Sequence, residues 1–174
     1  MFSIRFTAVS AALSVLLVAG VAEAAPKPKT DDATAKLAAA ASPMSAQALE
    51  AIYAGKTWKW KDGGGFFSAN GHKFTAWSQK GKAWSYGEGR WYATDGGKLC
   101  MQAYWRNKAS GGGGDITCFL HREKAGVIYQ KRSIGGDWYV FRNNPPKQTD
   151  EAQKIVRGDL VGKGLDRMKA MAKK

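Results

Sequence analysis

The sequence has few of the side chains from which catalytic and metal centres are built. Its 174 residues include two histidines, His72 and His121, and two cysteines. The histidines show no metal-ligand spacing, which argues against a zinc site. A Ser-His-acid triad would need one of these histidines, and the sequence contains no Gly-x-Ser-x-Gly elbow. His121 also precedes Arg122, whose charge should lower the pKa of the imidazole.

Acidic residues are also scarce, at 14 Asp and Glu against 27 Lys and Arg. Pairs such as Asp62 with Glu88 or Asp137 have the chemistry of a glycosidase, but most acids fall in turn sequences, where solvated caps are common. The Gly63–Gly65 run lacks the Lys-Ser/Thr of a phosphate-binding P-loop. We therefore expect a protein that is not an enzyme and that uses no cofactor and no metal. A hydrolase with an unrecognised acid pair is the alternative.

Long apolar runs are limited to one segment, Phe6–Ala22. Arg5 precedes it, and Ala22-Glu23-Ala24 follows with small residues at the two positions that a signal peptidase reads. Residues 1–24 are therefore predicted to be a Sec-type signal peptide cleaved after Ala24. We expect a periplasmic or secreted protein without a transmembrane segment after cleavage. Because a run of about 17 residues is at the lower limit for a membrane span, an uncleaved anchor is the alternative.

Export would place Cys100 and Cys118 in an oxidising compartment, where an even number of cysteines predicts a disulfide. If the two are cross-strand neighbours, their strands pair in a register in which Arg106 faces Gly112, and a hairpin loop lies between them. The bridge would then staple a hairpin without conflict in the register. Two buried thiols are the alternative.

The chain after the signal peptide divides into three parts by composition. Residues 25–44 are rich in Ala, Pro and Lys and contain no aromatic residue, so we expect a flexible tether there. Residues 45–162 form the predicted domain, and residues 163–174 form a basic C-terminal tail. A short helix capped by Ser42 or Ser45 should cover one end of the domain.

Between Thr57 and Arg142 the hydrophobic period changes to two, and turn sequences such as Asn70-Gly71 separate short segments. This pattern predicts a mainly β fold, a small antiparallel meander of about eight strands closed into a barrel or a sandwich, because closure removes exposed edges. A short C-terminal helix capped by Thr149 or Asp150 should follow. The strands that we expect are Thr57–Lys61, Gly65–Ala69, Lys73–Ser78, Lys82–Tyr86, Gly89–Thr94, Lys98–Arg106, Asp115–Arg122, Val127–Arg132 and Asp137–Arg142.

All seven tryptophans lie in this β region. Large rings fill a small barrel quickly, so seven tryptophans together with phenylalanines such as Phe119 exceed what one core needs. Trp58 and Trp60 are two residues apart and should point to the same side of the sheet. We expect the surplus rings to line a rim or an exposed patch. The Gly63–Gly65 run predicts a bulge or turn where aromatic rings crowd the backbone.

Seven blocks of the sequence carry a family resemblance: "YAGKTWKWKDGGGFF", "GEGRW", "KLCMQAYW", "TCFLHR", "IYQKR", "GDWYVFR" and "KIVRGD". In combination they resemble a family of exported alphaproteobacterial proteins catalogued as domain of unknown function 995. The resemblance would cover about Leu49–Val161. It implies export and a single domain, and it brings no activity and no catalytic residues with it.

Charge is the most informative feature for function. The net charge is +13 at pH 7, and Lys56–Arg142 holds 15 Lys and Arg against 6 Asp and Glu. A cationic surface with interleaved aromatic rings can pair with phosphate or carboxylate groups and stack on sugars. We therefore expect a non-catalytic envelope protein that binds an anionic envelope polymer, such as a glycan, or lipid headgroups. Nucleic acid fits the same physics, but the compartment argues against it. The candidate binding residues are Lys59, Trp60, Lys61, Arg90, Trp91, Trp105, Arg106, Arg122, Lys131, Arg132, Tyr139 and Arg142.

Two other binding functions stay open. In a lipocalin-like carrier the barrel would hold a small apolar ligand. Gly55-x-x-Trp58 and Arg142 resemble the Gly-x-Trp and closing Arg of that group, with a spacing that differs by one residue. A periplasmic lysozyme-inhibitor-like protein is the third hypothesis, although lysozymes of that type are basic and would be repelled. The sequence makes no prediction of oligomeric state.

Overall fold

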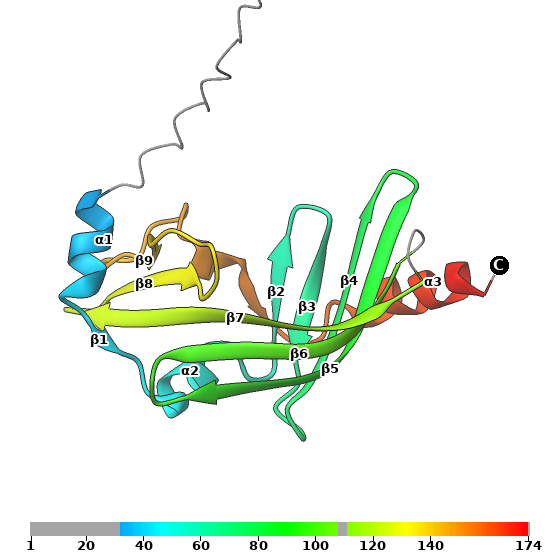
Figure 1. Cartoon of the computed structure of the whole chain (residues 1–174), viewed down its shortest axis with the longest axis horizontal. Helices are drawn as coiled ribbons and strands as arrows, with labels where there is room; N and C mark the ends of the chain where they lie inside the picture. Colours follow the sequence, from blue (N-terminus) through cyan, green and yellow to red (C-terminus); the bar gives the residue numbers. More distant parts are fainter. Residues whose placement is uncertain (1–31, 108–110, 174) are drawn as a thin grey trace, which may run out of the picture.

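The computed structural model of the chain describes residues 32–107 and 111–173. These residues form one antiparallel sheet together with three α-helices and one 3-10 helix (Figure 1). The predicted signal peptide, residues 1–24, lies outside them. No helix in this part of the chain is long and apolar enough to cross a membrane.

The sheet contains ten strands within the described residues, and most of them pair with their neighbours in sequence. The order is β10-β2-β3-β4-β5-β6-β7-β8-β9, and β1 pairs with β7. Every pairing is antiparallel, which confirms the predicted mainly β meander. The strands are β1 (Ser42–Pro43), β2 (Lys56–Trp60), β3 (Gly63–Phe67), β4 (Lys73–Lys80), β5 (Ala83–Thr94), β6 (Lys98–Asn107), β7 (Gly113–Lys124), β8 (Val127–Arg132), β9 (Tyr139–Arg142) and β10 (Ile155–Arg157).

The sheet curls into a half-barrel, as Figure 1 shows. Among the described residues its two end strands, β9 and β10, do not pair with each other, so closure is partial. The 3-10 helix η1 (Glu151–Lys154) lies between these ends and contacts β2, β9 and β10. Pro145 and Pro146 follow soon after β9 and lack the backbone N–H that a longer ladder would need. The chain therefore leaves the sheet at this point and bridges the opening with a short helix.

Asp150 fixes the bridging segment. Its buried carboxylate accepts hydrogen bonds from the Asn143 backbone N–H at 2.9 Å, from Asn143 Nδ2 at 2.5 Å and from the Lys147 N–H at 2.8 Å. Burial tends to raise the pKa of this carboxyl group, but the hydrogen bonds and the Lys147 charge outweigh it, and the pKa lies below its ordinary value. Asp150 thus orders a turn instead of capping an α-helix with its side chain, and a 3-10 helix, η1, follows it. The predicted C-terminal α-helix is present but begins later, at Gly162.

Two predicted strands, Lys82–Tyr86 and Gly89–Thr94, form the single strand β5. Glycines in a strand often mark a break, which is why the sequence pattern separated them. Here the ladder continues on both sides of Gly87, which faces Ala76 on β4 and Trp105 on β6.

Part of the predicted tether is ordered. Helix α1 (Asp32–Ala39) buries Ala38 against Tyr129, and the small alanine side chains allow this close packing. Arg122 Nη1 donates hydrogen bonds of 3.1 Å to the carbonyl oxygens of the last two residues of α1. These carbonyls have no partner within the helix, so the arginine caps its C-terminus. The expectation of a flexible segment is therefore wrong for residues 32–44.

The other two helices cover opposite faces of the sheet. Helix α2 (Ala46–Tyr53) is the predicted N-terminal helix, and Ser45 caps it by accepting a 3.1 Å hydrogen bond from the Ala48 N–H. Its Tyr53 packs into the main core inside the curl. Helix α3 (Gly162–Ala172) takes up most of the predicted basic tail and packs Leu165 and Met168 on the outer side of β4 and β5. The tail is helical because these apolar residues recur at helical spacing.

Cys100 and Cys118 form the predicted disulfide between β6 and β7. The two are direct cross-strand partners, and Tyr104 faces Gly114 in the same register. The register predicted from the cysteines alone is therefore confirmed.

Removal of the disulfide should destabilise the fold. The double substitution Cys100→Ala and Cys118→Ala should lower the free energy of unfolding by about 3 kcal/mol, because the bridge restricts the unfolded chain. Urea unfolding followed by tryptophan fluorescence measures the loss, and the wild-type protein in a reducing agent should show a similar loss. Equal urea midpoints for the oxidised wild type and the double variant would contradict this expectation.

Candidate ligand-binding site

Aromatic rings lie directly over glycine backbone on the inner face of the sheet. A Cβ atom at Gly65 would come within 2.8 Å of the Phe74 ring and 3.1 Å of the Trp60 ring. A Cβ atom at Gly87 would come within 2.8 Å of the Trp105 ring. The prediction that rings crowd the backbone near Gly63–Gly65 is confirmed, although these glycines lie in the regular strand β3 and form no bulge.

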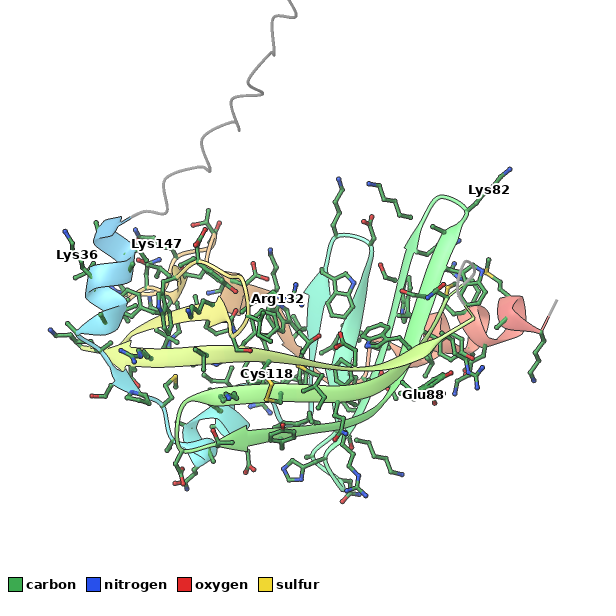
Figure 2. The ribbon with its side chains drawn as sticks, in the orientation of Figure 1. Lys36, Lys82, Glu88, Cys118, Arg132 and Lys147 are labelled. Carbon is green, nitrogen blue, oxygen red and sulfur yellow. A yellow bond between two sulfur atoms is a disulfide. The ribbon has the colours of Figure 1, made fainter. Side chains whose placement is uncertain are left out.

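The curl encloses a pocket of about 520 Å³, which we call the concave pocket. The strand residues that line this pocket share one face of the sheet, because directly paired residues point to the same side. Trp58 pairs with Gly65, Met101 with Thr117, and Phe119 with Arg132. Figure 2 shows Arg132 between the β7–β8 side and the β2–β3 side of the half-barrel. The pocket is lined by Trp58, Trp60, Phe67, Phe74, Met101, Trp105, Thr117, Phe119, Arg132 and Glu151.

Two charged side chains line this mostly aromatic pocket, Glu151 and Arg132, and only Glu151 has an oppositely charged partner among the described residues. Glu151 accepts a hydrogen bond of 2.9 Å from Trp58 Nε1 and pairs with Lys154 Nζ at 2.6 Å. Arg132 is exposed, and none of the ion pairs between described residues includes it. The pocket therefore offers one unpaired positive charge beside a set of aromatic rings. A guanidinium group in this setting can bind a carboxylate, sulfonate or phosphate through two parallel hydrogen bonds.

A network of buried polar side chains lies deeper inside the curl. His121 Nε2 lies 2.9 Å from the Tyr53 hydroxyl and 2.5 Å from Gln130 Nε2. Gln130 Nε2 also donates to the Tyr53 hydroxyl at 2.9 Å, and its Oε1 accepts a hydrogen bond from the Tyr139 hydroxyl. Because an amide nitrogen can only donate, His121 Nε2 acts as an acceptor and the imidazole is neutral. The network joins α2 to β7, β8 and β9.

Burial governs the ionisation of this network. Desolvation lowers the pKa of His121 to about 4, and the backbone carbonyls of Gly97 and Phe119 oppose that shift. Neither carbonyl forms a well-shaped hydrogen bond, since Nδ1 is buried without a hydrogen-bond partner among the described residues. From the sequence, the charge of Arg122 was expected to lower the pKa of His121. The pKa is lowered, but the cause is burial. Burial, followed by the charge of Glu151, raises the pKa of Tyr139 above its ordinary range.

The residues expected to form one basic, aromatic surface lie on both faces of the sheet. Trp60, Trp105 and Arg132 line the concave pocket. Trp91 is buried in the core, where its Nε1 donates to the Ser68 carbonyl oxygen. Tyr139 belongs to the polar network, Lys61 lies in the turn after β2, and Arg142 is half-buried on β9. By register, the outer face of the sheet carries Lys59, Arg90, Arg106, Arg122 and Lys131.

Two of the outer-face arginines already have partners within the fold. Arg122 caps α1 and lies over the Trp138 ring at 5.6 Å, and Lys131 lies over the same ring at 5.5 Å. Arg106 lies over the Tyr104 ring at 5.3 Å. These contacts are cation–π interactions that stabilise local structure.

Several residues of the concave pocket are absent from the binding residues expected from the sequence, among them Phe67, Met101 and Glu151. A signal was present for Met101. The Cys100–Cys118 register places Leu99 beside Phe119 and Met101 beside Thr117, on the face opposite the disulfide. No sequence signal places Glu151 there, because its position depends on the path of the chain after β9.

A family model described as "Protein of unknown function (DUF995)" matches residues 15–161. The matched range begins well before Leu49, where the resemblance in the sequence blocks began. No curated protein and no solved structure matches the chain.

The glycine beneath Trp105 should be required for the shape of the pocket. Gly87→Ala should lower the free energy of unfolding by about 1–3 kcal/mol, because the new methyl group would displace the indole ring. Gly114→Ala is the matched control: a methyl group at this position on β7 would meet open space, and the change in stability should stay within about 0.5 kcal/mol. Urea unfolding compares the two, and equal effects would contradict the close contact.

The neutral state of His121 should make stability fall in mild acid. The unfolded chain takes up a proton as the pH falls through 6.5, whereas the folded protein does so only near pH 4. The contribution of His121 is thus fully present above pH 6.5 and is lost progressively toward pH 4. Between pH 7.5 and 4.5 the loss should be about 2 kcal/mol.

Urea unfolding at both pH values measures this loss. In His121→Gln the difference between the two pH values should shrink by that amount, whatever the variant's absolute stability. His72→Gln, which changes the half-exposed histidine of the β3–β4 turn, should keep most of the difference. An unchanged pH dependence in His121→Gln would show that His121 does not remain neutral in the fold.

Proposed function

We propose a function from the concave pocket itself, because the chain belongs to the DUF995 family, whose description names none. The protein is a non-catalytic binding protein for a small amphipathic anion. The apolar body of the ligand lies against the aromatic rings, and its anionic group pairs with Arg132. This proposal combines the carrier expected as an alternative with the anion recognition expected from the charge.

The observation that carries the proposal is the combination of one unpaired arginine with aromatic walls in a pocket of about 520 Å³. Sites for small ligands commonly enclose about 300–1,000 Å³ and combine apolar walls with a few polar groups that orient the ligand. Glu151 is already held by Trp58 and Lys154, so its charge would repel an anion less than a free carboxylate would.

Two features of the site support binding rather than catalysis. Tyr53, His121 and Gln130 are buried and hydrogen-bonded to one another, and none of them lines the pocket. The low pKa of His121 makes it a poor proton acceptor near neutral pH.

The proposed setting is the cell envelope. Residues 1–24 have the pattern of a signal peptide, and the net charge of +13 suits a compartment that is rich in anionic glycans and lipids. An amphipathic anion released from such material is the kind of ligand that the pocket would take. The basic outer face would hold the protein near anionic polymers.

Dodecanoate and dodecanol make a matched pair of probes for the pocket. Tryptophan fluorescence should follow their binding, since Trp58, Trp60 and Trp105 line the walls. We expect the wild type to bind dodecanoate more tightly than dodecanol. Arg132→Gln should weaken dodecanoate binding about tenfold, equivalent to about 1.4 kcal/mol, and leave dodecanol binding unchanged.

Arg106→Gln is the control, because it removes the same charge from the outer face of the sheet. It should bind dodecanoate like the wild type. Trp105→Ala should weaken both probes, since it removes part of the wall. The proposal fails if neither probe binds, or if Arg106→Gln weakens dodecanoate binding as much as Arg132→Gln does.

A further inference from the structure

A second pocket, of about 420 Å³, lies on the outer side of the sheet, and we call it the outer pocket. It is formed by the end of β2, the turn into β3, the strand β4 and helix α3. Lys59 and Trp77 point to the face opposite the concave pocket by register. Trp60, at the end of β2, borders both pockets. The dodecanoate proposal uses none of the charged residues of this second site.

Three cations from two separate parts of the chain line the outer pocket. Lys59 and Lys61 come from β2 and its turn, and Arg167 comes from α3. All three are exposed, and the ion pairs between described residues include none of them. Asp62 is the one acidic residue in the lining within the described part of the chain. The lining thus carries a net charge of about +2, and this local excess of positive charge favours an anionic ligand.

Helix α3 is placed so that Arg167 faces the pocket. Gly164 lies against the Trp77 ring so closely that a Cβ atom there would overlap the indole. One turn later, the Arg167 guanidinium lies 5.4 Å from the centre of the same ring. A guanidinium group held over a ring by a cation–π contact keeps its N–H groups for hydrogen bonds. Lys169, two residues further along, is instead paired with Glu88 at 2.6 Å.

We propose that the outer pocket binds the phosphate group of a small ligand. A planar guanidinium and two flexible ammonium groups are the donors that phosphate recognition uses, and a phosphate monoester carries close to two negative charges at neutral pH. The pocket is larger than phosphate alone, so the rest of the ligand lies against Trp60, Trp77 and Leu160, whose side chain is 60% exposed. The phosphate group belongs either to a free phosphorylated polyol or to a lipid headgroup.

Calorimetric titration with glycerol 3-phosphate at constant ionic strength tests the free source. Arg167→Gln should weaken binding at least tenfold. Because this change could also loosen α3, Lys61→Gln in the turn gives an independent measurement, and it should weaken binding several-fold. Lys98→Gln removes an exposed charge from the outer face outside the pocket, and its affinity should equal that of the wild type.

Sedimentation with phosphatidylcholine vesicles that contain phosphatidic acid, whose phosphate is a monoester, tests the lipid source with the same variants. Binding of either probe that falls in Arg167→Gln and Lys61→Gln but not in Lys98→Gln supports the site and identifies the source. Trp105→Ala alters the concave pocket and not the outer pocket, so this variant should bind glycerol 3-phosphate and the vesicles like the wild type. The test of the outer pocket is therefore independent of whether dodecanoate binds in the concave pocket. Absence of binding to both probes, or equal losses in Lys61→Gln and Lys98→Gln, overturns the proposal.

Discussion

Contact between aromatic rings and bare glycine backbone shapes the inside of this protein. Trp60 and Phe74 lie over Gly65, and Trp105 lies over Gly87, at distances that leave no room for a methyl group. Because Gly65 and Gly87 carry no side chain, the rings can lie against the backbone of the sheet instead of further into the interior. The same contacts therefore supply the apolar burial that stabilises the curl and keep a pocket open within it. The walls of the pocket and part of the core are the same side chains.

A half-barrel needs its open edge covered, and the cover here is made of polar contacts. Asp150 orders the segment after β9, and the Trp58–Glu151 hydrogen bond holds η1 at the gap. Inside the gap, the network of Tyr53, His121, Gln130 and Tyr139 ties α2 to the last strands of the sheet. These groups are satisfied mainly by one another, so they specify how the ends of the sheet meet. The position of η1 in turn sets which charges reach the pocket.

Local patterns in the sequence were enough to predict most of the sheet, but not the short strands β1 and β10. Alternation and turn residues gave most strands within a few residues, and the two cysteines gave the correct β6–β7 register. The errors arose where tertiary contacts decide the outcome. The alanine-rich segment is helical because it packs against Tyr129 and Arg122 caps its C-terminus. Strand β5 is continuous because Trp105 covers Gly87. Neither partner is close in sequence, so composition alone favoured a tether and a break.

The candidate sites were harder to predict for a geometric reason. Side chains alternate between the two faces of a strand, so Lys59 and Trp60 are neighbours in sequence but belong mainly to different sites. The excess of lysine and arginine therefore predicts anion binding without predicting which residues would take part. Contacts within the fold then remove some cations from consideration, as Arg122 and Lys131 show beside Trp138. Two separate groups of cations line pockets, Arg132 among the inner rings and Lys59, Lys61 and Arg167 beside Trp77. Each joins unpaired positive charge to an indole ring, and the alternation of the strands keeps the two groups on opposite sides of the sheet.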